Sequence, residues 1–190
     1  MLRSVVVVAA LALTPQAVGW RASATTGVQV TERAGVVTVR TGQGGGVDVW
    51  RADAQPLQGA YVVRATLRKL GGRLHEGYGV LFGGRALGTD SARYAYAMIR
   101  GDGGLLVKRR DGQATTVVRD WTRSDAIRRD DARGRAENVL EVQVTATEVI
   151  VRVGGAELAR ISARELHTSG LAGLRVSHEM ELEVAGFLAR

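Results

Sequence analysis

The feature that most constrains this chain is the alternation of apolar and polar residues with a period of two. Residues 28–33 read Val-Gln-Val-Thr-Glu-Arg and residues 36–41 read Val-Val-Thr-Val-Arg-Thr, on either side of Ala34-Gly35. Because successive side chains of a strand point to opposite faces, this pattern predicts two half-buried β-strands. The short spacer between them predicts a hairpin. The chain shows hardly any of the three-and-four spacing that an amphipathic helix needs.

The same pattern recurs at short intervals along the rest of the chain. Glycine makes up 25 of the 190 residues, against 2 prolines, and lies mostly between the apolar runs, as many tight turns require. So many short strands predict an all-β fold, a sandwich or a barrel. Residues 125–137 are charged and predict a surface loop, and residues 162–167 predict a single helical turn. The further strands are expected at residues 47–51, 61–67, 79–82, 94–100, 105–110, 115–121, 139–145, 149–153, 158–161, 171–176 and 180–187.

The N-terminus has the order of features that an export signal shows. Arg3 is followed by an apolar run over residues 5–13, then by Pro15 and the small residues Ala22-Ser23-Ala24. The run is shorter than the about 20 apolar residues that span a bilayer. We therefore predict a cleaved signal peptide over residues 1–24 rather than a membrane span.

Two alternatives accompany that prediction. Ala17-Val18-Gly19 is a second candidate cleavage site. If the segment is not a signal peptide, the alternative is that it forms a buried first strand of the fold. Residues 25–190 contain no internal repeat and no linker rich in proline, serine or glycine. They predict a single domain that is secreted or periplasmic.

Composition excludes several classes of function. The chain has no cysteine, so it has no disulfide and no thiol for catalysis or metal binding. The formal charge is +7, or +5 once Arg3 and Arg21 leave with the predicted signal. Because the arginines are dispersed along the chain, we expect a solvated basic surface, with a surface for an anionic polymer as the alternative. An exported chain is not expected to bind nucleic acid.

Several glycine-led motifs from residue 61 onward resemble the concanavalin A-like lectins and glucanases. Residues 77–84 look like the strand that opens the concave sheet of that jelly roll, and residues 94–104 look like the next strand and its turn. Residues 138–155, with Gly154-Gly155 as the hairpin, resemble later strands, and residues 170–187 resemble the strand pair that closes the sandwich. The chain is most similar to exported bacterial domains of the family-sixteen-like or 3-keto-disaccharide hydrolase-like type. This resemblance implies a two-sheet antiparallel β-sandwich.

A carbohydrate-binding face is the first functional expectation. Sugar rings stack on aromatic side chains and accept hydrogen bonds from planar polar groups, and both types recur on the strands that the resemblance assigns to the concave sheet. Tyr94 and Tyr96 share one face of their strand by alternation. The competing interpretation is that these aromatic residues belong to the core. The expected ligand-binding residues are Arg64, Tyr78, Tyr94, Tyr96, Arg100, Lys108 and Trp121.

The alternative is a glycoside hydrolase that uses Glu179, Glu181 and Glu183. Alternation places these carboxylates on one face of a strand, and a retaining glycosidase needs two carboxyl groups about 5–5.5 Å apart. The run departs from the laminarinase-like pattern, since Glu181 replaces the middle aspartate and the strand is the last one. A solvated outer face of a closing strand is therefore the favoured interpretation of this trio.

Metal and cofactor chemistry has little support in the sequence. The three histidines, His75, His167 and His178, lack ligand-like spacing, so no metal site is predicted. Calcium is the one ion left open, because several aspartates fall on predicted turns. These are Asp102, Asp111, Asp130 and Asp131. We therefore expect a secreted, non-catalytic module that binds a glycan or oligosaccharide, with a hydrolase or a structural, adhesive envelope domain as the alternatives.

Overall fold

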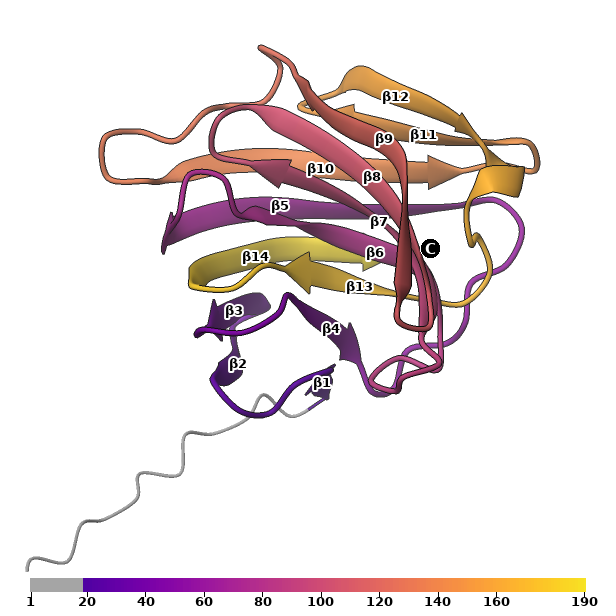
Figure 1. The fold of residues 1–190 in the computed structure, drawn as a ribbon, viewed down its shortest axis with the longest axis horizontal. Coiled ribbons are helices and arrows are strands. Elements are labelled where there is room, and N and C mark those ends of the chain that lie inside the picture. The colour runs from indigo at the N-terminus through magenta and orange to yellow at the C-terminus, as the bar shows by residue number, and fades with distance from the viewer. Residues whose placement is uncertain (1–18) are drawn as a thin grey trace, which may run out of the picture.

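The computed structural model describes residues 19–190, which form two antiparallel sheets of seven strands each (Figure 1). Sheet A contains, in spatial order, β1 (Trp20–Ala22), β4 (Val47–Arg51), β13 (Leu171–Val176), β6 (Gly77–Arg85), β7 (Arg93–Arg100), β8 (Gly104–Asp111) and β9 (Ala114–Arg123). Sheet B contains β12 (Ala156–Ser162), β11 (Glu148–Val153), β10 (Ala136–Val144), β5 (Tyr61–Gly72), β14 (Met180–Ala189), β3 (Val36–Thr41) and β2 (Val28–Arg33). The predicted all-β sandwich is confirmed.

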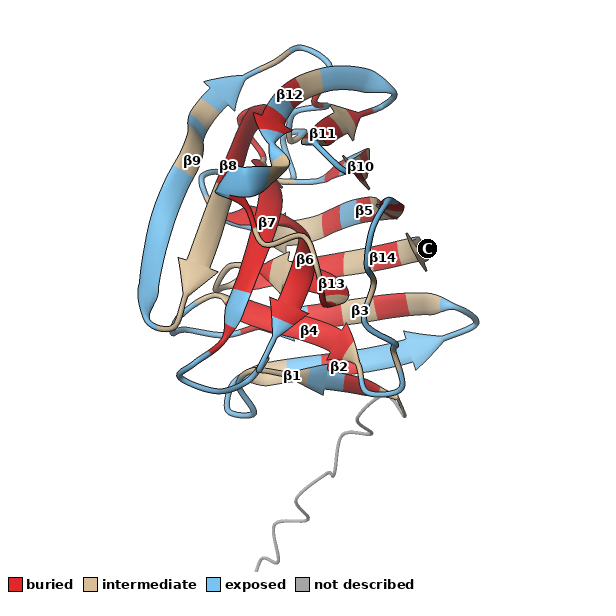
Figure 2. Cartoon of the chain, turned by 90° about the vertical axis from the view of Figure 1, so that its right-hand side faces the viewer, coloured by how far each residue is buried: buried red, intermediate tan, exposed pale blue. Residues whose placement is uncertain are grey.

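The core lies between the two sheets and is built from alternate residues of each strand. On β10, Leu140, Val142 and Val144 point inward, and the residues between them are more exposed. Sheet A departs from this alternation, because β6 and β7 are buried on both faces (Figure 2). Its outer face therefore carries a second layer of packed side chains, which positions the candidate site described below.

Two predicted hairpins have the geometry that their residues favour. Gly154 and Gly155 join β11 to β12 with φ angles of 58° and 88°, and Ala34 and Gly35 join β2 to β3 with φ angles of 50° and 76°. Positive φ at both central residues matches the turn twist to the right-handed twist of the strands. The expected helical turn is a 3-10 helix, η1 (Ala163–Glu165). Among the described residues, no helix is long and apolar enough to cross a membrane.

The predicted signal segment is partly built into the fold. Residues 1–18 lie outside the described residues, but Trp20–Ala22 form β1 and pair with β4. Trp20 is 8% exposed, its ring meets Phe187 edge-on at 5.7 Å, and its Nε1 donates a hydrogen bond of 2.9 Å to Glu32. Within the described residues, Trp20–Ala22 thus form the edge strand of sheet A next to β4.

The expectation that residues 170–187 form a strand pair is wrong. β13 lies between β4 and β6 in sheet A, whereas β14 lies between β5 and β3 in sheet B. The chain crosses from one sheet to the other between them, through Glu179, whose φ is 53°. Alternation in the sequence identifies which face of a strand is buried but not which strand becomes its neighbour.

Candidate binding face on sheet A

Strand register places residues of six strands in rows across the outer face of sheet A. Residues directly opposite each other in antiparallel strands project to the same side of the sheet. One row consists of Trp50, Gly173, Leu81, Tyr96, Lys108 and Val117. The neighbouring row consists of Asp48, Arg175, Gly79, Met98 and Leu106. Tyr94 stands opposite Arg110 beside them.

This face gathers a large share of the aromatic residues of the protein. The chain has nine, and four of them lie here: Trp50, Tyr94, Tyr96 and Trp121. On the opposite sheet, the outward residues in the middle of β5 are polar: Arg64, Thr66 and Arg68. Aromatic side chains that are not needed between the sheets are thus concentrated on one of the two outer faces.

Each of three arginines lies over one of these aromatic rings. The guanidinium carbon of Arg100 is 4.3 Å from the ring centroid of Trp121. The corresponding distance is 5.8 Å for Arg110 over Tyr94 and 5.7 Å for Arg175 over Tyr96. A cation–π contact of this kind contributes about 0.5–2 kcal/mol. The rings therefore hold a layer of guanidinium groups in place on the solvent side.

The lower layer of this arrangement is inaccessible to a ligand. Tyr94 has no exposed surface and Tyr96 is 5% exposed, so neither can offer a free ring face. Burial and the Asp48 carboxylate raise the pKa of the Tyr94 phenol to about 12, so the hydroxyl stays protonated. Trp121 is the half-buried ring of the set. The groups that a ligand can reach are Trp121 and the cationic side chains.

Arg175 is held by a buried ion pair. Its Nη1 donates to Asp48 Oδ1 at 2.8 Å and to the Gly46 carbonyl at 2.9 Å, and the Asp48 side chain is only 1% exposed. Burial alone would lower the pKa of Arg175, but Asp48 outweighs it and raises the pKa, so the group stays charged. The Arg175 side chain is 16% exposed, and among residues 19–190 all its hydrogen bonds come from Nη1. Nε and Nη2 remain as donors.

The structure brings five of the seven predicted ligand-binding residues together and separates two. Tyr94, Tyr96, Arg100, Lys108 and Trp121 share the outer face of sheet A. Tyr78 does not lie there, because it points inward like Val80 and Phe82 on the same strand and is fully buried between the sheets. Arg64 projects from the outer face of sheet B.

Sequence reasoning missed Asp48, Trp50, Arg110 and Arg175. A signal was present at two of them, since Asp48 interrupts a run of apolar residues in β4 and Arg175 stands between the inward-facing Leu174 and Val176 in β13. A single polar residue in an otherwise apolar strand points away from the core by alternation. That two such residues meet across neighbouring strands follows only from the pairing of β4 with β13.

The glutamate trio lies away from this face. Glu181 and Glu183 belong to β14 in the middle of sheet B, and Glu179 precedes that strand. Arg40 pairs with Glu181 at 2.6 Å, Arg68 with Glu183 at 3.4 Å, and Arg73 with Glu179 at 2.8 Å. Three half-exposed carboxylates with arginine partners form an ion-paired outer surface.

The aspartates considered for calcium do not converge on one point. The Asp102 carboxylate accepts hydrogen bonds from Arg100 at 2.6 Å, from Arg123 at 3.2 Å and from the Gly104 N–H. Burial alone would raise the pKa of Asp102, but these hydrogen bonds outweigh burial and lower it. The others are held separately: Asp111 by Arg93, Arg109 and His167, Asp130 by Lys69, and Asp131 by backbone N–H groups. Within residues 19–190 no group of three or more histidine, aspartate or glutamate side chains could hold a metal ion. Calcium needs several convergent oxygen ligands, so these residues do not fit it.

Comparisons with known proteins place the fold and leave the family open. No protein-family model matches the chain, and no curated protein matches it. Among solved structures, the carbohydrate-binding module CBM66 from Bacillus subtilis is similar over 90% of this chain and 95% of its own, with a TM-score of 0.71 and 9% identity. A Bacillus subtilis protein of unknown function with a galectin-like fold covers 90% and 88%, with a TM-score of 0.67 and 11% identity. The exoplasmic/lumenal domain of VIP36, in a Ca²⁺/Man-bound form, covers 90% and 84%, with a TM-score of 0.61 and 10% identity.

Proposed function

We propose that this protein is an exported, non-catalytic carbohydrate-binding module, and that its glycan lies across the outer face of sheet A. The observation that carries the proposal is the layer of Arg100, Arg110 and Arg175, each held over an aromatic ring. Solved structures of similar fold include a carbohydrate-binding module and a mannose-bound lumenal domain, which supports this class of ligand. Fold alone does not carry function, so the proposal depends on the residues of the face.

The residues of the face suit distinct parts of a sugar. Trp121 offers an apolar ring on which a pyranose can stack. Arg175 presents Nε and Nη2, and Lys108 presents its ammonium, as donors to ring hydroxyls. Tyr94 and Tyr96 act as supports beneath the arginines, because they are buried. Fixed donors lose little side-chain freedom on binding, which favours affinity.

The glycoside hydrolase alternative receives less support from the same residues. A glycosidase needs one carboxyl group that is protonated and can act as general acid. Each of Glu179, Glu181 and Glu183 is instead engaged by an arginine in an ion pair. We therefore propose that the chain shares a fold with family-sixteen-like or 3-keto-disaccharide hydrolase-like domains but not the catalytic chemistry of those enzymes.

The test is a glycan-array screen of the protein starting at Trp20, followed by isothermal titration calorimetry of each hit with and without calcium. Trp121→Ala should weaken binding at least about fivefold, since stacking of this kind contributes about 1 kcal/mol or more. Trp121 also packs near Gly77 and Gly104, so Lys108→Gln serves as a second variant that leaves the packing intact. Glu181→Gln on sheet B is the matched control and should bind as the wild type does.

Each outcome has a definite meaning. Binding that is lost in Trp121→Ala or Lys108→Gln and kept in Glu181→Gln supports the module. Release of reducing sugar by the wild type but not by Glu181→Gln would replace it with the hydrolase. No glycan bound by the folded wild-type protein would leave the structural or adhesive envelope domain as the better interpretation.

A further inference from the structure

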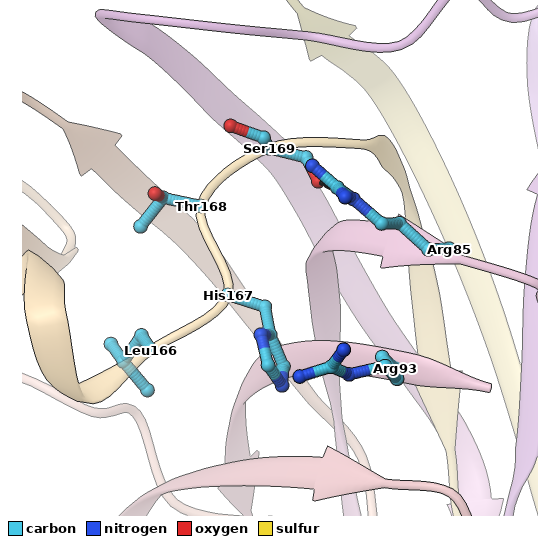
Figure 3. Close-up of a pocket in the computed structure, with 6 residues that line it drawn as sticks. All are labelled: Arg85, Arg93, Leu166, His167, Thr168 and Ser169. Carbon is cyan, nitrogen blue, oxygen red and sulfur yellow. Dashed lines mark hydrogen bonds between the residues drawn. The ribbon is translucent and has the colours of Figure 1, made fainter. Parts of the chain in front are cut away.

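A pocket of about 220 Å³ opens at the end of the sandwich where the segment after η1 passes the ends of β6 and β7 (Figure 3). It is distinct from the binding face on sheet A, because Arg93 and Tyr94 are consecutive in β7 and project to opposite sides of the sheet. The proposed glycan-binding residues are not among its lining residues, which are Arg85, Arg93, Leu166, His167, Thr168 and Ser169.

The pocket is lined by more positive charge than the protein neutralises. Arg85 and Arg93 stand directly opposite each other on β6 and β7, an arrangement of like charges that destabilises a sheet unless something compensates it. Asp111 is the carboxylate at this site, and it is shared by Arg93 Nε at 3.2 Å, Arg109 Nε at 2.9 Å and His167 Nε2 at 2.7 Å. Two arginines and a histidine thus share one carboxylate.

Arg85 is the arginine that this sharing leaves out. Its Nε donates to the Ser169 carbonyl at 3.0 Å, which fixes the side chain along one wall of the pocket (Figure 3). Among residues 19–190 it has no carboxylate within 4.0 Å, so its charge is uncompensated by the described chain. The guanidinium of Arg93 and the ring of His167 lie side by side on the other wall.

The wall that carries His167 is held rigidly. A Cβ on Gly83, whose φ is 63°, would lie 2.1 Å from the His167 carbonyl oxygen, so the segment packs directly on the backbone of β6. Two backbone hydrogen bonds between Leu57 and Gly170, of 2.8 and 3.0 Å, fix the far end of the segment. The charged groups are therefore positioned before any ligand arrives, which reduces the entropic cost of binding.

From these observations we infer that the pocket is an anion site that takes a single oxyanion group, a carboxylate, sulfate or phosphate, through Arg85 and Arg93. Arginine presents parallel N–H donors that match two oxygens of such a group. The volume is below the about 300–1,000 Å³ of pockets for drug-sized ligands, which suits one charged group. The oxyanion offsets the repulsion between the opposed arginines. The inference does not depend on the glycan-binding proposal.

The experiment measures binding of sodium sulfate, sodium phosphate, D-galacturonate and uncharged galactose by calorimetry at constant ionic strength. Arg85→Gln is the test variant, because Arg85 is exposed and has no carboxylate partner whose loss would disturb the fold. Arg64→Gln, which removes the same charge from the outer face of sheet B, is the matched control. We expect at least one anion to bind the wild type, and Arg85→Gln to weaken it at least about fivefold, the loss of one charge-assisted hydrogen bond.

The outcomes separate the sources of the oxyanion and the two proposals. Binding of galacturonate but not sulfate identifies a planar carboxylate, and the reverse identifies a tetrahedral anion; both support the site. The same anion affinity in Trp121→Ala as in the wild type shows that the pocket acts independently of the sheet A face. Absence of binding by all three anions, or equal losses in Arg85→Gln and Arg64→Gln, would overturn the inference.

Discussion

Removal of β1 should destabilise the protein substantially, although this strand contains only Trp20–Ala22. The strand buries Trp20 against Phe187, satisfies its Nε1 with Glu32 and covers the open edge of β4. Loss of a buried tryptophan side chain costs about 3–5 kcal/mol. For a domain of this size, 1 kcal/mol shifts the Tm by about 2–4 °C. A chain starting at Thr25 should therefore melt about 10 °C below a chain starting at Trp20.

The assay is thermal unfolding of the two chains, followed by far-UV circular dichroism, with Trp20→Phe in the longer chain as control. Phenylalanine keeps most of the ring packing but loses the hydrogen bond to Glu32, which contributes about 1 kcal/mol. The Tm of the Trp20→Phe variant should lie between the Tm values of the chains that start at Trp20 and at Thr25. Equal melting temperatures for the chains starting at Trp20 and Thr25 would refute the reasoning.

Because β1 packs into the fold, we expect the second candidate cleavage site to be the one that is used. Cleavage after Ala24 would remove β1, whereas cleavage after Gly19, the second candidate, would leave it intact. We propose that an exported form of the protein begins at Trp20. Intact-mass measurement of protein collected outside the cytoplasm checks this, and a mass that corresponds to a start at Thr25 would contradict it.

Three further predictions concern stability. Gly83→Ala should lower the free energy of unfolding by more than about 2 kcal/mol in denaturant titration, because its methyl group would collide with the His167 carbonyl at positive φ. Lys69→Met should cost about 3–5 kcal/mol by leaving Asp130 buried without a cation, and adding Asp130→Leu should recover much of that loss. Because the pKa of Asp102 is lowered in the fold, its contribution is complete above about pH 4 and lost as the pH falls toward the folded pKa. Asp102→Asn should therefore flatten the acid side of the stability curve, and an unchanged curve would count against this ion pair.

Local patterns predicted the strands well because a strand with one buried face must alternate. All of the strands expected from residue 28 onward are present, and the turns at Ala34-Gly35 and Gly154-Gly155 are where their residues favour them. β1 was missed because its three residues lie within a segment that also has the order of an export signal. These residues fit both the pattern of an export signal and a strand of the fold, and only the packing of Trp20 against Phe187 reveals the strand.

The candidate site was predictable in part, because alternation along a strand indicates which residues share a face. Tyr94, Tyr96 and Arg100 share the outer face because they are two and six residues apart on one strand. Tyr78 was misplaced because aromatic character alone does not decide between the core and the outer face of a strand that is buried on both sides. The ion pair of Asp48 with Arg175 joins residues 127 positions apart in the chain.

The sequence by itself determined the strand content, the turns, the lack of thiol chemistry and the basic charge, since these follow from local alternation, glycine positions and composition. Only the tertiary structure decided which strands became neighbours, that β13 and β14 enter different sheets, and that three arginines meet three aromatic rings on one face. It also decided that Arg85 and Arg93 stand opposite each other beside a pocket. The physical reason is that strand pairing is set by the summed burial of both sheets, a property of the whole chain that no short segment contains.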